Sequence, residues 1–179
     1  MFYTTTYDSE LVGAITIASD GSSIVGLWLV GQKYYGGTVG EEMAENDALP
    51  VLGQAKKWLD RYFAGEKPAI AELPLAPRGS AFRQRVWNLL IEIPYGQTRT
   101  YGDLAQQISC ETGKRMANQA VGGAVGHNPI SIIVPCHRVV GTNGSLTGYA
   151  GGLKYKQLLL AHEGVDMSGF FVPTKGTAL

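Results

Sequence analysis

The chain has 179 residues, of which 45% are hydrophobic, so it can bury a core and fits one large domain or two small ones. Its net charge of zero argues against a protein that coats nucleic acid without specificity. The charges are unevenly distributed, because residues 1–75 carry five Lys or Arg and ten Asp or Glu, whereas residues 76–179 carry ten and five. The C-terminal half could therefore face a polyanion, although a solvated basic face is an equally ordinary cause.

Neither a membrane segment nor a metal site is predicted. No basic and then apolar leader opens the sequence, and no apolar run approaches the roughly 18 residues that span a bilayer. Cys110 and Cys136 are too few for a disulfide framework or a cysteine-rich zinc site, and the three histidines lack metal-site spacing. We expect a cytoplasmic protein whose two thiols stay reduced.

The first third of the chain is predicted to form a small antiparallel sheet covered by one helix. Three strand-like segments are separated by turn signals at 8–9 and 20–21. These segments span residues 2–7, 11–18 and 23–30. After a polar, glycine-rich loop at 31–47, apolar residues recur at helical spacing from Val51 to Phe63, and Gly65 ends that helix.

A linker is predicted at 67–79, where three prolines, Pro68, Pro74 and Pro77, occur without a helical period. We place the domain boundary near residue 77. This division gives an N-terminal domain at 1–77 and a C-terminal domain at 78–179, in an α+β protein.

The C-terminal domain is predicted to be mainly helical and to contain a helix-turn-helix. Ser80 is a suitable N-cap for its first helix. Thr100, with Asp103 at the capping-box position, begins a short helix to about residue 109, and Gly113 ends the turn that follows. A second helix then spans 114–126, which completes the helix-turn-helix. Its buried face is predicted to hold Ala117, Ala120, Val121, Ala124 and Val125.

The opposite face of this second helix carries Arg115, Asn118, Gln119 and Gly122. Glycine in a helix interior costs about 1 kcal/mol relative to alanine, so the Gly122-Gly123 pair needs a reason. The glycines either let another helix pack closely or give a smooth face that can approach a nucleic-acid groove. The sequence alone leaves both open, and the basic residues of the same half favour the groove.

A reactive cysteine is indicated by the segment Pro135-Cys136-His137-Arg138-Val139, which follows an apolar run at 130–134. A thiol attacks only as the thiolate, and a free thiol with a pKa of about 8.5 is only a few per cent ionised at neutral pH. His137 and Arg138 could accept the proton or stabilise the negative charge. The alternative is an inert structural cysteine, which is common in buried positions.

A final amphipathic helix is predicted at 153–162, and Glu163 follows it directly. Cys136, His137 and Glu163 fit the order of nucleophile, base and orienting group, in which the carboxylate fixes the tautomer of the imidazole. Because neighbouring residues do not easily touch through their side chains, we expect a bridging water between Cys136 and His137. Glu163 could equally cap or pair at the helix end.

From residue 82 to residue 164 the sequence resembles the O6-alkylguanine-DNA alkyltransferases. The matching segments are Tyr101-Gly102, Ala120-Val121-Gly122, Asn128-Pro129, Pro135-Cys136-His137-Arg138-Val139, Gly148-Tyr149-Ala150-Gly151-Gly152 and Ala161-His162-Glu163-Gly164. The cysteine segment is highly specific in this context, whereas the glycine patches alone would be weak. The resemblance implies a ribonuclease-H-like N-terminal domain, of which the first 75 residues carry only the generic sheet-plus-helix layout.

The resemblance also implies a reaction, which is DNA repair by direct reversal of damage. Cys136 would accept the alkyl group from O6 of guanine through a network of Cys136, water, His137 and Glu163. Asn128 would brace the turn, and Tyr101 would protonate the leaving base. No cofactor is implied. The thioether cannot be hydrolysed, so each molecule would act once.

The implied partner is double-stranded DNA that carries O6-alkylguanine, bound by a monomer through the minor groove, with the damaged nucleotide flipped out. O4-alkylthymine is a possible further substrate. In a bacterium the protein would be associated with the nucleoid. The DNA-binding residues would be Arg115, Asn118, Gln119, Ala120, Gly122 and Arg138. The base pocket would be formed by Val139, Tyr149 and Ala150.

Two positions depart from the family pattern. Gln119 stands where many members have an arginine that inserts into the base stack, and glutamine lacks its charge and planar fork. Ala150 stands where some relatives have serine, but its backbone N–H remains, so we expect little effect.

Two other functions compete with alkyl transfer. A protein that flips and flags the lesion without reacting is disfavoured by Cys136, since such relatives commonly have tryptophan there. A cysteine hydrolase or acyltransferase would need turnover and an oxyanion hole, and it gives no reason for a helix-turn-helix beside the thiol.

Overall fold

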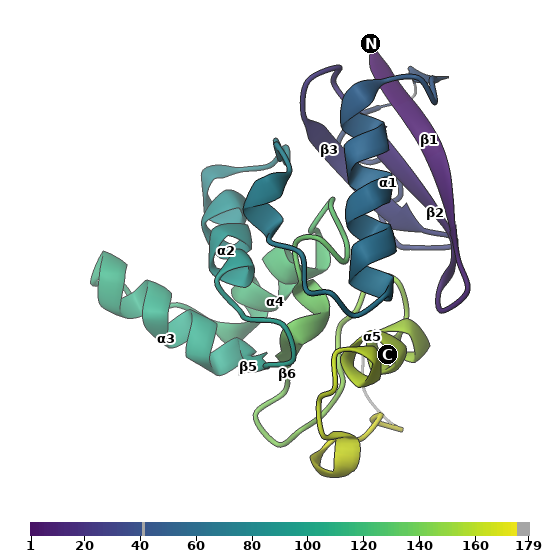
Figure 1. Cartoon of the computed structure of the whole chain (residues 1–179). Helices are drawn as coiled ribbons and strands as arrows, with labels where there is room; N and C mark the ends of the chain where they lie inside the picture. The colour runs from purple at the N-terminus through teal and green to yellow at the C-terminus, as the bar shows by residue number, and fades with distance from the viewer. Residues whose placement is uncertain (41, 175–179) are drawn as a thin grey trace.

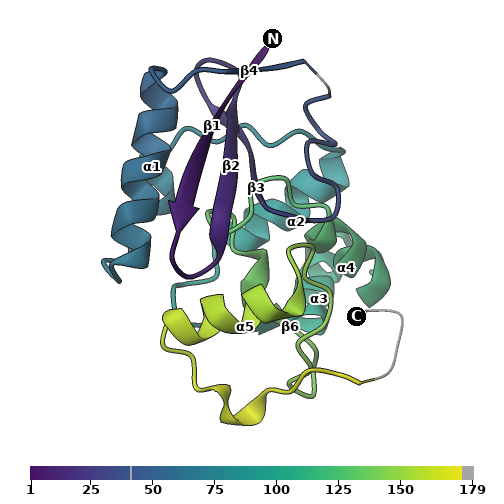
Figure 2. The same ribbon diagram turned by 90° about the vertical axis from the view of Figure 1, so that its right-hand side faces the viewer.

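The computed structural model describes residues 1–40 and 42–174 (Figure 1). Its first part is a four-stranded sheet with helix α1 (Pro50–Phe63) along one face, and its second part groups the remaining helices (Figures 1 and 2). The expected α+β class is confirmed, while the domain boundary near residue 77 stays a prediction. No helix in the described ranges is long and apolar enough to cross a bilayer.

The sheet has the strand order β3-β2-β1-β4. The strands β1 (Phe2–Ser9), β2 (Gly13–Ser19) and β3 (Ile24–Leu29) pair antiparallel, as predicted. The expectation of a purely antiparallel sheet is wrong, because β4 (Met43–Glu45) adds to β1 in parallel. This strand lies inside the predicted loop at 31–47, and three residues are too few to show an alternating pattern.

Helix α1 covers the sheet as its pattern predicted. Its buried residues recur every three or four positions and are Val51, Leu52, Ala55, Trp58, Leu59 and Tyr62. Gly65, with φ +82°, follows the helix in a left-handed conformation. Trp58 Nε1 donates to Ala69 O at 2.9 Å, which fixes the helix to the segment that leads into the second half.

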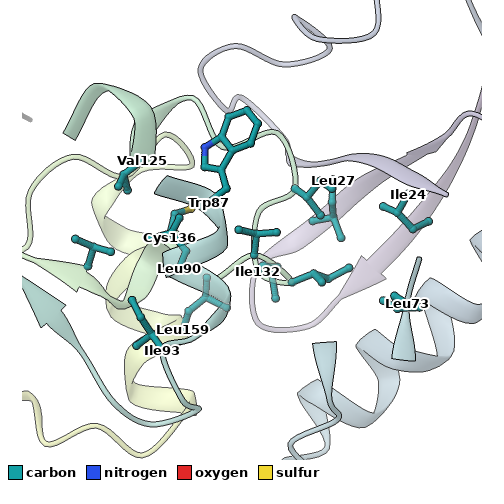
Figure 3. Packing of buried hydrophobic residues seen from close by; sticks show 14 of the residues in the cluster. Ile24, Leu27, Leu73, Trp87, Leu90, Ile93, Val125, Ile132, Cys136 and Leu159 are labelled. Carbon is teal, nitrogen blue, oxygen red and sulfur yellow. The ribbon is translucent and has the colours of Figure 1, made fainter. Parts of the chain in front are cut away.

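Strand β3 connects the sheet to the second half of the chain. All six of its residues are buried. Leu27 N donates to Pro129 O at 2.8 Å, and Ser131 N donates to Leu27 O at 3.0 Å. One hydrophobic cluster accordingly includes residues of both halves, among them Leu27, Trp87 and Cys136 (Figure 3). The thiol therefore belongs to a core that neither half forms alone.

The second half contains helices α2 (Ala81–Ile91), α3 (Tyr101–Thr112), α4 (Asn118–Gly126) and α5 (Leu153–His162). A short parallel pair, β5 (Arg99–Thr100) with β6 (Val139–Val140), lies beside them. The predicted caps are present. Ser80 Oγ accepts from Arg83 N at 3.3 Å, and Thr100 and Asp103 form the capping box of α3. The described ranges also contain three single 3-10 turns: η1 (Ile70–Glu72), η2 (Cys136–Arg138) and η3 (Met167–Gly169).

Helix α4 begins at Asn118 and not at Lys114, so the predicted start and part of the predicted buried face are wrong. Met116 N donates to Ser109 Oγ at 2.8 Å, which turns the chain back along α3 before α4 starts. Ala117 is the N-cap, and both Ala117 and Ala120 are exposed. The buried residues of α4 are Val121, Ala124 and Val125.

Two glycines of the helix-turn-helix are expected to respond in opposite ways to alanine. Gly113 ends α3 with φ +66°, so Gly113→Ala should lower the free energy of unfolding by about 1 kcal/mol through backbone strain. Gly123 lies inside α4 with open space around its missing Cβ, so Gly123→Ala should raise it by up to about 1 kcal/mol. Urea unfolding of the two variants measures both changes in the free energy of unfolding. Changes of the same sign would contradict the conformations assigned to Gly113 and Gly123.

Candidate active site

Cys136 opens turn η2 and is 4% exposed. The backbone that precedes it is held by Asn128, whose Nδ2 donates to Val134 O at 2.8 Å and whose Oδ1 accepts from Ile130 N at 3.1 Å. Between Asn128 and Val134, Ile132 has φ +70°, an uncommon conformation for a β-branched residue. Asn128 therefore braces the segment at 128–134 that leads to the cysteine.

Glu163 forms the centre of a buried polar cluster. His137 Nε2 lies 2.6 Å from Glu163 Oε1, and Arg138 donates from Nε and Nη2 to the same carboxylate at 2.8 and 2.9 Å. Tyr62 of α1 donates its hydroxyl to Glu163 Oε1 at 2.7 Å, and Gly96 N donates to Oε2 at 3.2 Å. The carboxylate therefore pairs with the imidazole and is not a simple helix cap.

The surroundings of Glu163 keep it ionised. Burial by itself would raise the pKa of the carboxyl, but the hydrogen bonds from His137 and Arg138 and the charge of Arg138 outweigh it and hold the pKa well below its usual range. Burial lowers the pKa of His137, against the opposing effect of Glu163, so the imidazole is neutral at pH 7. With Nε2–H donating to Glu163, Nδ1 keeps its lone pair as a proton acceptor.

The buried Nδ1 atom of His137 is the free end of this pair. Among the described residues it has no hydrogen-bond partner. A buried imidazole nitrogen without a partner in a polar cluster is costly to keep unless it has a role or a bridging water. It is therefore the atom of this cluster available to take a proton.

The thiol itself is not activated by burial. Burial raises the pKa of Cys136, and the hydrogen bond of Asn128 and the positive charge of Lys156 oppose that rise. The thiol is thus protonated in the resting protein. A base has to remove its proton during the reaction, and the arrangement of His137 suits that task.

Lys156 is a residue of this region that the sequence analysis missed. It is fully buried on α5, and its Nζ donates to Thr147 O at 2.8 Å and also to Val139 O. Burial lowers its pKa to about 8. The signal was available, because Lys156 lies three residues after Leu153 and four before Leu160, on the apolar side of the helix.

Tyr101 and Tyr149 lie close to the cysteine. Burial, followed by the charge of a Cys136 thiolate, raises the pKa of both hydroxyls. Tyr101 donates its hydroxyl to Thr147 O at 2.9 Å. A Cβ at Gly148 would come within 2.9 Å of the Tyr101 hydroxyl oxygen. Both phenols therefore stay protonated beside the thiol, and Gly148 is required for the close approach of Tyr101.

Two cavities meet at Gly122 and Gly148. One, of about 360 Å³, is lined by Tyr149, Ala150 and other residues of the loop at 148–152. The other, of about 400 Å³, is lined by Tyr101, Asn118 and Gln119. Their sizes are typical of small-ligand sites. Of the residues predicted to form the base pocket, Tyr149 and Ala150 line the first cavity, whereas Val139 is fully buried, lines neither cavity, and accepts from Lys156 through its carbonyl.

Four of the six predicted DNA-binding residues lie together on α4. Asn118, Gln119 and Ala120 are exposed there, and Gly122 borders both cavities. Arg115 precedes the helix and shares a surface hollow with Gln119. The placement of Arg138 at a DNA surface is contradicted, because it is 5% exposed and its guanidinium is used by Glu163 and by Ile93 O at 2.6 Å.

The described part of the chain holds no group of three or more His, Cys, Asp or Glu side chains that could bind a metal ion.

A buried thiol beside a helix-turn-helix defines a class of protein that acts on DNA through a cysteine. The model of the 6-O-methylguanine DNA methyltransferase ribonuclease-like domain matches residues 2–77, and that of the DNA binding domain matches residues 81–165. The chain therefore belongs to the 6-O-methylguanine DNA methyltransferase family, whose activity is DNA repair by alkyl transfer to a cysteine, and the resemblance seen in the sequence is confirmed.

Individual relatives agree with this assignment. The chain is 43% identical over 158 residues to a methylated-DNA–protein-cysteine methyltransferase of Haemophilus influenzae, covering 88% of this chain and 84% of that protein. It is 45% identical over 154 residues to the protein of the same description from Methanosarcina acetivorans, covering 86% and 93%. The crystal structure of Mycobacterium tuberculosis OGT in complex with DNA matches with a TM-score of 0.79 and 42% identity, covering 90% of this chain and 92% of that one.

Loss of the Glu163 charge should destabilise the protein strongly. Glu163→Gln leaves the Arg138 guanidinium buried without a counter-charge, so we expect the free energy of unfolding to fall by about 3 kcal/mol at pH 7. The matched control is Glu72→Gln, which breaks an exposed ion pair with Arg61 and should change stability much less.

The pH dependence of stability in wild type and Glu163→Gln gives a second test. The carboxyl of Glu163 has a folded-state pKa below its ordinary value of 4.5, so its contribution is present above about pH 4.5 and is lost as pH falls through the folded pKa. The stability difference between wild type and Glu163→Gln should therefore shrink in acid, as measured by urea unfolding across pH. A difference that stays constant down to the acid limit would show that Glu163 is not ionised in the fold.

Proposed function

We propose that this protein transfers the alkyl group of O6-alkylguanine in double-stranded DNA irreversibly to Cys136, once per molecule. The observation that carries the proposal is the buried His137–Glu163 pair, whose free Nδ1 belongs to the residue next to Cys136. Relatives described as methylated-DNA–protein-cysteine methyltransferases support it, and so does the similarity to a structure bound to DNA.

The proposed reaction begins with removal of the thiol proton. His137 Nδ1 accepts it through a bridging water, and Glu163 stabilises the imidazolium that forms. The Cys136 thiolate attacks the alkyl carbon, a Cys Sγ–C bond forms, and the bond from that carbon to guanine O6 breaks. A thiolate suits this attack because it is a soft nucleophile.

The leaving guanine takes a proton as the bond breaks. Tyr101 is the proposed donor, since burial and the nearby thiolate keep its hydroxyl protonated until the transition state. The Cys136 thiolate loses its negative charge as the Sγ–C bond forms, and Tyr101 becomes a phenolate when it gives its proton to guanine. The proton that His137 took from the thiol can then pass to this phenolate and neutralise it. The product is a thioether with no hydrolysable bond, so the protein is consumed.

The proposed DNA contact is made by α4 in the minor groove. Gly122 and Gly123 give this helix a small-residue face on which the duplex can approach closely. The damaged nucleotide would leave the stack, at a cost of a few kcal/mol, and enter between α4 and the loop at 148–152. Gln119, on the same exposed face, would fill the space it leaves.

Three further parts of the proposal concern the molecule as a whole. It acts as a monomer, its two functional domains divide near residue 77, and it works in the cytoplasm, where its two free thiols, Cys110 and Cys136, remain reduced. O4-alkylthymine is a second substrate to test.

The first test is the mass of the intact protein after incubation with duplex DNA carrying one O6-methylguanine. Wild type should gain one methyl group per molecule and then stop, whereas Cys136→Ala should gain none. The matched control is Cys110→Ala, which removes the exposed thiol and should react like wild type. Continued turnover would indicate a hydrolase or acyltransferase, and lesion-selective binding without mass gain would indicate a recognition protein.

A second test concerns the glutamine at the position of the usual arginine. Gln119→Arg should tighten binding to lesion DNA and speed its repair by roughly tenfold, equal to about 1.4 kcal/mol, because arginine adds a charge and a planar fork. Single-turnover rates and DNA titrations measure both. Gln54→Arg adds the same charge to an exposed position of α1 and should change neither. An unchanged rate and affinity in Gln119→Arg would refute the assignment.

A further inference from the structure

A buried side chain in the turn after β3 reaches the segment that precedes the cysteine. Gln32 is 5% exposed, and its Oε1 accepts from two donors, Leu29 N at 3.1 Å and Ser131 Oγ at 3.0 Å. Gln32 N donates in turn to Leu29 O at 3.1 Å. Both lone pairs of the amide oxygen are therefore used, one by its own turn and one by a residue 99 positions away.

Ser131 receives this contact and is itself fully engaged. It is 1% exposed, and its hydroxyl donates to Gln32. Its backbone N donates to Leu27 O at 3.0 Å, and its carbonyl accepts from Ile133 N at 2.8 Å. The N-terminal half therefore holds Ser131 both by its backbone and by its side chain.

The residue that follows is held in a costly conformation. Ile132 is fully buried in the cluster shared by both halves (Figure 3), and its φ of +70° lies in the left-handed region. A β-branched residue stays in that region only where its surroundings hold it there. The contact of Gln32 with Ser131 lies on one side of Ile132, and the contact of Asn128 with Val134 O lies on the other. Loss of either contact would allow the segment to relax.

Backbone hydrogen bonds connect this segment to the residue that carries the thiol. Val134 N donates to Ile130 O at 3.0 Å, and Cys136 N donates to Val134 O at 2.8 Å. A change of conformation at Ile132 would therefore displace Val134 and, through it, the backbone of Cys136. Attack on a saturated carbon needs an aligned nucleophile, and small displacements of a reacting group slow such a step considerably.

We propose that Gln32 is a positioning residue for alkyl transfer, which holds the strained segment before Cys136 through the Ser131 hydroxyl and so keeps the sulfur aligned for attack. The proposal rests on the proposed function and adds to it a residue of the N-terminal half. Gln32 lines neither of the two cavities that meet at Gly122 and Gly148. Its loss should accordingly slow the transfer step and leave DNA affinity unchanged.

The test measures single-turnover methyl transfer to Cys136 from a duplex with one O6-methylguanine, over a range of DNA concentrations. Gln32→Ala and Ser131→Ala should each lower the rate at saturating DNA about tenfold, without changing the DNA concentration at half-saturation. The double variant should be no slower than Gln32→Ala, because both substitutions break the same bond. The matched control is Thr5→Val, which removes a buried hydroxyl that donates to Asp47 elsewhere in the N-terminal half and should keep both values.

The outcomes separate the positioning role from the reaction itself. An unchanged saturating rate in Ser131→Ala, a double variant that multiplies the two single effects, or an equal loss in Thr5→Val overturns the positioning role and leaves alkyl transfer intact. A wild-type protein that transfers no methyl group to Cys136 overturns the proposed function. Urea unfolding verifies that each variant is folded, and Ser131→Ala, which removes one hydroxyl, decides the question if Gln32→Ala does not fold.

Discussion

The structure of the site depends on one buried carboxylate. Glu163 binds His137, Arg138, Tyr62 and Gly96, so a single ionised group fixes the imidazole, offsets a buried guanidinium and reaches α1 of the other half. A buried charge of this kind is tolerated only when its hydrogen-bonding capacity is filled, and each of its oxygens here accepts from more than one donor. The same contacts that make the carboxylate stable also orient the base.

The two halves contribute differently to this arrangement. The C-terminal half supplies the thiol, the base and the helix-turn-helix, while the N-terminal half supplies support: Tyr62 holds Glu163, Leu27 holds the backbone before the cysteine turn, and Lys33 holds Ala150. These contacts explain why an N-terminal sheet with no reacting group still matters to the chemistry.

Much of this could be read from the sequence where the signal is local. The capping box at Thr100 and the left-handed Gly113 follow from residue type and spacing, whereas the residues alone left the role of Glu163 open and its pairing with His137, 26 positions away, came from the family resemblance. The sequence misled where partners are distant. Arg138 looked like a surface cation because its partner lies 25 positions away, and the start of α4 was misplaced because one hydrogen bond to Ser109 competes with helix formation. The position of Lys156 on the apolar side of α5 indicated burial, but the backbone carbonyls that accept from its Nζ cannot be read from the sequence, so its place near the site was overlooked.

Strand β3 is the last strand of its sheet, and an unpaired strand edge is a template on which other chains can add. Here that edge is occupied at two places by the same chain, through Ile24 with Leu75 and Leu27 with Ile130. The segments that cover it are the approach to the cysteine and the connection between the halves. The protein thus protects itself from intermolecular strand pairing with the very backbone that shapes its site, and a variant that loosens the cysteine turn would be at risk of aggregation as well as of inactivity.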